Sequence, residues 1–334
     1  MSQPNTPKRQ LRLGAFIMPT GHHIAAWRHP GSQADSGVNI DHYIEVAKTA
    51  ERGLFDQVFV ADSPGIWHQG DDESFSRQGR VSHFEPVTLW AALSAVTKHI
   101  GFVATASTTY EDPFLLARKF ASLDHISQGR AAWNVVTTSA ESVHGNFGLD
   151  AHPDPATRYE RAHEFVEVVK GLWDSFEDDA FSRDKDSGVY FDPHKLHKLN
   201  HVGQHFKVSG PLNIERPPQG HPVIVQAGSS EDGKELAAAT AEARCLRGWG
   251  KAGTGKYAEA LLDLAGCRGG DPAFALAELQ SRVELKQWSE AAALLATFIG
   301  GVPFFFGPII GAIVFIFFVV ALSGFTKAWL LYLG

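Results

Sequence analysis

The sequence is poor in cysteine and carries no excess of positive charge. Only 2 of its 334 residues are cysteine, which excludes a disulfide framework and a cysteine-rich metal site. The 30 Lys and Arg residues are outnumbered by 37 Asp and Glu residues, so the formal net charge is -7. Such a composition offers no basic face, and we expect no nucleic-acid partner. The first 12 residues lack the apolar run of a cleavable signal peptide, so the start of the chain predicts a cytoplasmic location.

The composition changes near residue 241. All 16 histidines lie at or before His221, whereas both cysteines lie after residue 241. Residues 1–240 carry 22 basic and 30 acidic side chains, whereas residues 241–334 carry 8 and 7. The shift predicts segments of different origin, which divide as 1–240, 241–296 and 297–334.

The last segment has a long run without charge. No Asp, Glu, Lys, Arg or His occurs from Thr297 to Thr326, and the run is rich in Phe and Ile. A run of this kind is typical of a membrane helix, here at about 308–325, and the alternative is a buried core helix. We therefore predict membrane contact, and anchoring of the chain, through 297–334. Residues 241–296 have helical periodicity interrupted at 269–272, which predicts a helical hairpin.

The first 240 residues alternate between apolar strands and amphipathic helices. Five buried strands alternating with helices imply a parallel α/β sheet. A doubly wound sheet and a (β/α)8 barrel both fit, but no Gly-x-Gly-x-x-Gly follows the first strand, which favours the barrel. Strands are predicted at 11–18, 57–61, 100–106, 131–137 and 222–226. Helices are predicted at 40–53, 86–97, 113–127, 158–177 and 233–242, loops at 63–84 and 138–157, and a hairpin of 205–208 with 212–215.

Polar residues follow the first two strands. His22 and His23 end the first one and could act as a general base, hydrogen-bond donors or, less readily, metal ligands. The alternative is a pair of ordinary loop histidines, and we expect no metal. Asp62 follows the second strand, where a carboxylate must be solvated or paired. Its alternative role is to cap the next segment.

The third and fourth strands carry polar groups of another kind. Thr105 opens a run of small hydroxyl residues that lets a flat ring approach the backbone, although Thr also simply favours strands. Asn134 lies in an otherwise apolar strand, where its amide is costly unless hydrogen-bonded. It could bind the polar edge of a heterocycle or be satisfied within the protein.

The fifth strand leads into a turn before a helix. Ser229 and Ser230 in this turn are suited to hold a phosphate at the helix N-terminus, although Ser also caps helices routinely. Tyr159, at the start of an earlier helix, could donate to the same phosphate. Together these residues predict a pocket for a phosphorylated aromatic cofactor at one end of a barrel.

Residues 11–240 also contain an ordered set of motifs. The chain resembles, through these motifs, the bacterial-luciferase-like flavin-dependent monooxygenases, in the nitrilotriacetate monooxygenase component A branch. The motifs are Ala61-Asp62-Ser63-Pro64, Ala104-Thr105-Ala106-Ser107-Thr108-Thr109, Ser122-Leu123-Asp124-His125-Ile126-Ser127-Gln128-Gly129-Arg130, Ala132-Trp133-Asn134-Val135-Val136-Thr137, Asn146-Phe147-Gly148, Arg158-Tyr159-Glu160-Arg161-Ala162 and Gln226-Ala227-Gly228-Ser229-Ser230.

The resemblance implies a fold, a cofactor and partners. The fold would be a (β/α)8 TIM barrel of luciferase-like type, truncated after about five strands because the resemblance stops near Glu242. The cofactor would be FMN, supplied as FMNH2 by a separate NAD(P)H:flavin reductase. With O2 it would form a flavin C4a-hydroperoxide that oxygenates a small organic substrate, such as an aminopolycarboxylate or an organosulfur compound. Such a chain could also form a homo-oligomer.

The resemblance also implies roles for particular residues. His22 and His23 would be catalytic, near the reacting face of the flavin. The isoalloxazine would be bound by Asp62, Thr105 and Asn134, and the phosphate end by Tyr159, Ser229 and Ser230. One position departs from the family, because Pro155 stands where the branch has a histidine four residues before the tyrosine, and His152 lies close by.

The tail resembles a different family. Residues 300–312 are similar to a late segment of branched-chain amino-acid permeases. Two alternatives to an active monooxygenase follow: an inactive truncated or hybrid chain, and a membrane-anchored, transport-related protein.

Overall fold

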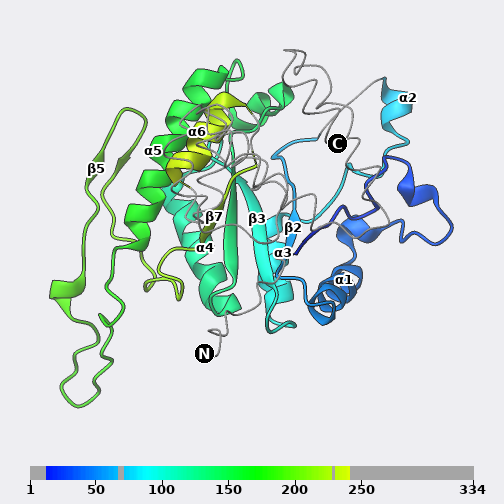
Figure 1. Ribbon diagram of the computed structural model, residues 1–334. Helices are drawn as coiled ribbons and strands as arrows, with labels where there is room; N and C mark the ends of the chain where they lie inside the picture. Colours follow the sequence, from blue (N-terminus) through cyan, green and yellow to red (C-terminus); the bar gives the residue numbers. More distant parts are fainter. Residues whose placement is uncertain (1–12, 67–70, 228–229, 241–334) are drawn as a thin grey trace, which may run out of the picture.

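The computed structural model describes residues 13–66, 71–227 and 230–240 (Figure 1). The strands are β1 Gly14–Phe16, β2 Gln57–Val60, β3 Gly101–Ser107, β4 Ala131–Val136, β5 His201–Val202, β6 Lys207–Val208 and β7 Val223–Val225. The α-helices are α1 Ile40–Arg52, α2 Asp72–Phe75, α3 Pro86–Ser94, α4 Pro113–Ser127, α5 Pro155–Trp173 and α6 Glu231–Thr240. Short 3-10 helices are η1 Ala26–Arg28, η2 Ser36–Val38, η3 Glu141–Phe147 and η4 Pro193–Lys195.

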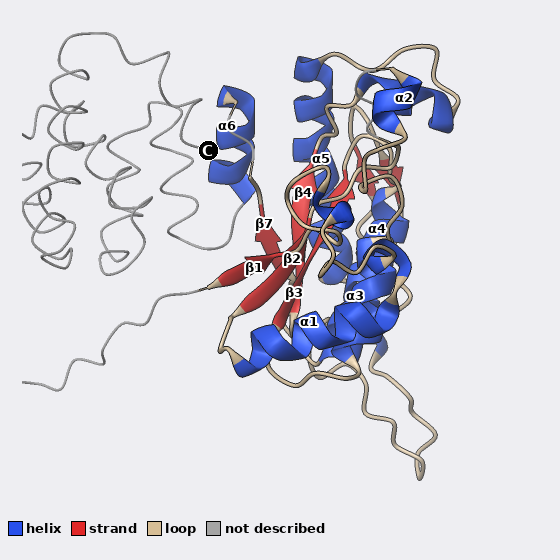
Figure 2. Ribbon diagram, turned by 90° about the vertical axis from the view of Figure 1, so that its right-hand side faces the viewer, coloured by secondary structure: helices blue, strands red, loops and turns tan. Residues whose placement is uncertain are grey.

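The main sheet is parallel and follows the order of the sequence. Its strands lie in the order β1-β2-β3-β4-β7, and every neighbouring pair is parallel. Helices α1, α3, α4 and α5 cover one face of the sheet (Figure 2). This is the arrangement of consecutive β/α units in a barrel, and it confirms the predicted parallel α/β sheet. The part of the chain that the structure describes supplies five strands of it and no closed barrel.

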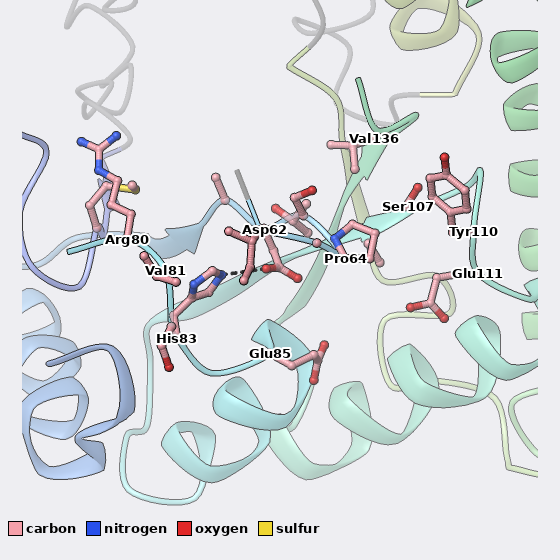
Figure 3. A pocket seen from close by; sticks show the side chains of 18 of the residues that line it. Asp62, Pro64, Arg80, Val81, His83, Glu85, Ser107, Tyr110, Glu111 and Val136 are labelled. Atoms are coloured by element: carbon pink, nitrogen blue, oxygen red, sulfur yellow. Dashed lines mark hydrogen bonds and ion pairs between the residues drawn. The ribbon is translucent and has the colours of Figure 1, made fainter. Parts of the chain in front are cut away.

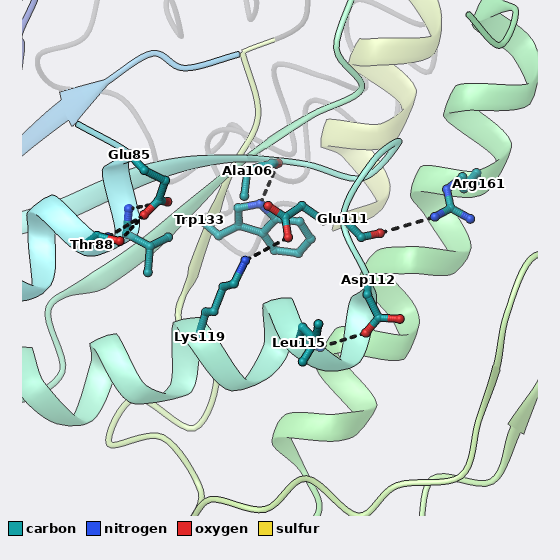
Figure 4. Close-up of polar contacts among 10 residues, drawn as sticks. Glu85, Thr88, Ala106, Glu111, Asp112, Leu115, Lys119, Trp133 and Arg161 are labelled. Atoms are coloured by element: carbon teal, nitrogen blue, oxygen red, sulfur yellow. Dashed lines mark hydrogen bonds and ion pairs between the residues drawn. The ribbon is translucent and has the colours of Figure 1, made fainter. Parts of the chain in front are cut away.

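The core lies between the sheet and these helices. Trp90 and Trp133 are fully buried there, and each indole N–H is satisfied by a backbone carbonyl. Trp90 donates to the oxygen of Val103 at 2.8 Å, and Trp133 donates to that of Ala106 at 3.1 Å (Figure 4). The first bond joins α3 to β3 and the second joins β4 to β3. They therefore hold β3, the central strand of the sheet, which contains Thr105.

Three helices begin with the same local signal. Glu85, Asp112 and Asp154 each cap a helix whose first residue is proline, and each carboxylate accepts an N–H of the first turn. Figure 4 shows one case, in which Asp112 accepts the N–H of Leu115 at 2.9 Å. The prediction of α4 was confirmed at both ends. Helix α5 begins three residues earlier than predicted, because the Asp-Pro cap precedes Arg158.

Two local predictions were wrong. The predicted hairpin of 205–208 with 212–215 is instead formed by β5 and β6. Leu212 cannot pair there, since it is buried and its N–H donates to the Ser175 hydroxyl at 2.9 Å. The predicted loop at 63–84 contains the short helix α2, which Asp71 caps by accepting the N–H of Ser74.

The predicted membrane span at 308–325 lies outside the described residues, as do the segments 241–296 and 297–334. Within the described ranges, none of the helices is both long and apolar enough to cross a membrane.

Candidate active site

The carboxyl ends of the parallel strands meet at one edge of the sheet, where a pocket opens. Its volume is about 680 Å³. Residues of β3, of the segment after β3 and of the long loop between β2 and α3 line it (Figure 3), and they include Asp62, Arg80, His83, Thr105, Tyr110 and Glu111. Ligands of parallel α/β sheets bind at this end of the strands, as the sequence predicted.

Asp62 points into this pocket and is paired. His83 Nε2 donates to Asp62 Oδ1 at 2.9 Å (Figure 3), and both side chains are partly buried. The loop that carries His83 is held against η2 by a close contact. A Cβ on Gly37 would lie 2.0 Å from the carbonyl oxygen of Ser82, so a larger residue does not fit. The Asp62–His83 pair could not be predicted from the sequence, since the two residues lie 21 positions apart on either side of α2.

Thr105 and Asn134 form a buried pair across β3 and β4. Thr105 is 5% exposed and donates its hydroxyl to the oxygen of Val60 at 2.8 Å. Asn134 is 3% exposed and donates from Nδ2 to Thr105 Oγ1 at 3.0 Å. No described group donates to Asn134 Oδ1, although that atom is buried. A buried amide oxygen without a donor is costly, and it is suited to accept an N–H from a bound heterocycle.

Tyr159 and Ser230 come together although they lie 71 positions apart in the sequence. Their hydroxyl oxygens share a hydrogen bond of 3.0 Å. Ser230 also accepts the N–H of Gly233 at 3.1 Å, so it lies at the N-terminus of α6. Two hydroxyls at a helix N-terminus can hold a phosphate. Ser229 lies outside the described residues, and its predicted role stays a prediction.

His22 and His23 lie on the loop after β1 and are exposed. His22 Nε2 donates to the oxygen of Phe16 at 3.2 Å and stacks edge-on against its ring, with centroids 5.0 Å apart. His23 Nδ1 accepts the N–H of Ala25 at 3.1 Å. The pocket is lined by Met18 and Ile24 of the same loop rather than by these histidines. The described structure therefore does not bring them together with Asp62, and their catalytic role stays a prediction.

The region around Pro155 contains a pair that the sequence did not predict. A hydrogen bond of 2.6 Å joins the Tyr110 hydroxyl to His152 Nδ1, and Tyr110 stacks on Phe147. His152 Nε2 is buried and finds no partner among the described groups. Burial, and then the positive charge of Arg158, lower the pKa of His152. Pro155 itself is the first residue of α5 and offers no donor.

Arg158 is a buried residue that sequence reasoning missed. It is 8% exposed and donates from Nη1 to the carbonyl oxygens of Thr137 at 3.1 Å and Thr138 at 2.6 Å. These bonds fix the carboxyl end of β4 to the first turn of α5, next to Tyr159. The only feature of the sequence that pointed to Arg158 was its position in the motif, directly before Tyr159.

The site residues fit two parts of a flavin mononucleotide, its ring and its phosphate. Asn134 Oδ1 provides a buried acceptor for the N–H of a ring, and the Tyr159–Ser230 pair provides hydroxyls at a helix N-terminus for a phosphate. Within the described residues, no cluster of three or more His, Cys, Asp or Glu side chains could hold a metal ion.

The comparison with protein families identifies the class of protein. The sequence model described as "Luciferase-like monooxygenase" matches residues 18–301, most of the chain, and the chain belongs to this family. The match continues past residue 240, where the motif resemblance ends, through the segment 241–296. The boundaries predicted there stay predictions.

Known proteins of the family are similar to this chain over about 70% of its length. It is 57% identical over 235 residues to N-acetyl-S-(2-succino)cysteine monooxygenase of Bacillus subtilis (strain 168), covering 70% of this chain and 52% of the relative. It is 51% identical over 240 residues to nitrilotriacetate monooxygenase component A of Aminobacter aminovorans, covering 70% and 53%. The chain thus spans about half the length of these curated relatives.

A solved structure supports the fold. The crystal structure of a long-chain alkane monooxygenase matches with a TM-score of 0.67 at 33% identity, over 84% of this chain and 72% of that chain. The resemblance of residues 300–312 to a permease finds no support in these matches.

Proposed function

We propose that this chain is the oxygenase of a two-component flavin monooxygenase. It would bind FMN reduced by a separate NAD(P)H-dependent reductase and use O2 to oxygenate a small organic substrate. Two relatives support the substrate class, since they are named for N-acetyl-S-(2-succino)cysteine and nitrilotriacetate. The word "component" in the second name supports a separate partner.

One observation carries the proposal: the contact between Tyr159 and Ser230 at the N-terminus of α6. These two residues are 71 positions apart, and each was predicted for the phosphate from its own sequence context. Two hydroxyls and the N-terminal N–H groups of α6 would hold the phosphate. Asn134 and Thr105 would bind the ring at the ends of β3 and β4.

The chain's own residues would position and shield the reactants. The flavin supplies the oxygen-transfer chemistry, and the protein contributes orientation and exclusion of water. Thr105 holds the Asn134 amide so that Oδ1 stays free to accept. Asp62 and His83 line the pocket and are joined by a hydrogen bond between Oδ1 and Nε2.

The phosphate assignment is tested by binding, without turnover. The variant Tyr159→Phe/Ser230→Ala should bind FMN about tenfold to a hundredfold more weakly, because two hydrogen bonds to a charged group are lost. Riboflavin, which lacks the phosphate, should bind the wild type and the variant equally. Affinities would be measured by the quenching of flavin fluorescence.

A matched control is available in the segment between α5 and β5. The variant Tyr190→Phe/Ser187→Ala removes the same groups from exposed positions and should leave FMN affinity unchanged. Equal FMN affinity of the wild type and the Tyr159→Phe/Ser230→Ala variant would refute the phosphate assignment.

A further inference from the structure

The charged side chains that line the pocket are nearly all paired with protein groups. Asp62 accepts from His83. Glu85 accepts the N–H groups of Val87 and Thr88 and so serves α3 as its cap. Glu111 pairs with Lys119 at 3.0 Å (Figure 4). Each of the three carboxylates that line the pocket therefore already has a partner within the protein.

Arg80 differs from them. Among the described residues no carboxylate forms an ion pair with it, and its Nε is buried without a hydrogen-bond partner. Figure 3 shows Arg80 at one end of the pocket beside Val81 and His83, with Tyr110 and Glu111 at the other end. A guanidinium nitrogen shielded from water without an acceptor is costly, and an anion in the pocket would remove that cost.

The backbone next to Arg80 is firmly held. The N–H of Gly79 donates to the oxygen of Ile24 at 3.2 Å, and the oxygen of Gly79 accepts from the Thr20 hydroxyl at 3.1 Å. A Cβ on Gly79 would lie 2.7 Å from Cδ1 of Trp27, so the loop packs closely there. The backbone that precedes Arg80 in the pocket lining is therefore held in place, as a specific ligand contact requires.

We propose that Arg80 is a specificity-determining residue that binds a carboxylate of the substrate. The substrate is then a small organic anion, and this inference rests on the proposed function for its oxygenation. A guanidinium presents paired N–H donors that match the two oxygens of a carboxylate, which makes the contact selective against amides and alcohols. Met18, Ile24 and Val81 line the same pocket and would contact the carbon chain.

Calorimetric titration of the full chain with adipate and with its uncharged analogue adipamide tests the proposal. Adipate should bind the wild type, and Arg80→Gln should weaken it about tenfold to a hundredfold, since a charge-assisted contact is lost. Adipamide should bind both proteins with the same weak affinity. Arg80→Lys should recover part of the adipate affinity, because it restores the charge without the paired donors.

Arg77→Gln is the matched control. Arg77 lies three residues earlier, is 67% exposed and pairs with Glu73 at the surface, so its loss should leave adipate affinity unchanged. Equal adipate affinity of the wild type and Arg80→Gln, or no adipate binding to the wild type, would overturn the proposal. FMN affinity, measured in parallel on Arg80→Gln, should equal that of the wild type. Failure of the wild type to bind FMN would refute the proposed function instead.

Discussion

Polar side chains that are buried in whole or in part fall into two groups in this protein. Arg130 and Arg158 donate to several backbone oxygens, so their hydrogen bonds lie within the protein. Asn134 Oδ1, His152 Nε2 and Arg80 Nε are buried without a partner among the described groups. The first group stabilises the fold, whereas the second lies at or near the carboxyl ends of the strands. Side-chain atoms of Ser36, Tyr43, Ser63 and His205 are also buried without a described hydrogen-bond partner, so the indication of a ligand site comes from the pocket at these strand ends together with the unsatisfied atoms near it.

Arg130 illustrates the structural group and gives a prediction. Its guanidinium donates to the carbonyl oxygens of Ser127 at 2.6 Å, Ile100 at 2.8 Å and Ser94 at 2.9 Å. Arg130→Met keeps the apolar stem but leaves these oxygens without donors, so the free energy of unfolding should fall by about 2–4 kcal/mol. Urea denaturation would measure the change.

The control for that measurement is Arg77→Met. Arg77 lies just after α2 and forms an exposed ion pair with Glu73 of that helix, so its loss should cost no more than about 0.5 kcal/mol. Equal losses in the two variants would contradict the structural role of Arg130.

The elements of the fold differ in how well the sequence predicts them. Helix α4 was predicted at both ends, because Asp112 and Pro113 mark its start and Gly129 follows its end. The strands β2, β3, β4 and β7 were predicted as buried apolar runs. The hairpin β5–β6 was not, because its register depends on contacts with α5 that no local pattern encodes.

The residues of the candidate site also differ in whether the sequence predicts them. The positions of Asp62, Thr105, Asn134, Tyr159 and Ser230 could be predicted, since each follows or lies within a strand or lies at the start of a helix, whereas their binding roles stay predictions. His83 and Arg80 could not, because they lie on a long polar loop. The course of that loop is set by tight contacts at Gly37 and Gly79, which depend on the folded state.

We expect the contact between Glu164 and the hairpin to depend on pH. The carboxylate of Glu164 on α5 accepts from the ring of His201 and from the N–H groups of His205 and Phe206, each at 2.9 Å. Burial alone would raise the pKa of Glu164, but these hydrogen bonds outweigh it and hold the pKa below its ordinary value. A lowered folded-state pKa stabilises the protein above the unfolded pKa of about 4.3, and the gain is lost as the pH falls through the folded value.

Glu164→Gln tests this dependence. The difference in free energy of unfolding between the wild type and Glu164→Gln should be largest near neutral pH and should shrink as the pH falls below about 4.3. Glu167→Gln, at an exposed position on the same helix, should show no such pH dependence. A difference for Glu164→Gln that stays constant across this range would contradict the account.

The whole molecule contains the parallel sheet typical of the family, in a chain whose match spans about half the length of its curated relatives. The five described parallel strands carry at their carboxyl ends the pocket, the Asn134 acceptor and the Tyr159–Ser230 pair. The central claim is that these features together form a flavin site in this chain. Activity depends on that claim, and so does the role of Arg80 in choosing the substrate.

A flavin titration tests the claim most directly. The full chain would be purified in mild detergent and titrated with FMN and with dithionite-reduced FMN, while tryptophan fluorescence is followed. The account predicts saturable binding of the reduced form, with weaker binding of riboflavin because it lacks the phosphate. Absence of binding by a chain with a folded far-UV spectrum would mean that the family's residues are present without a working site.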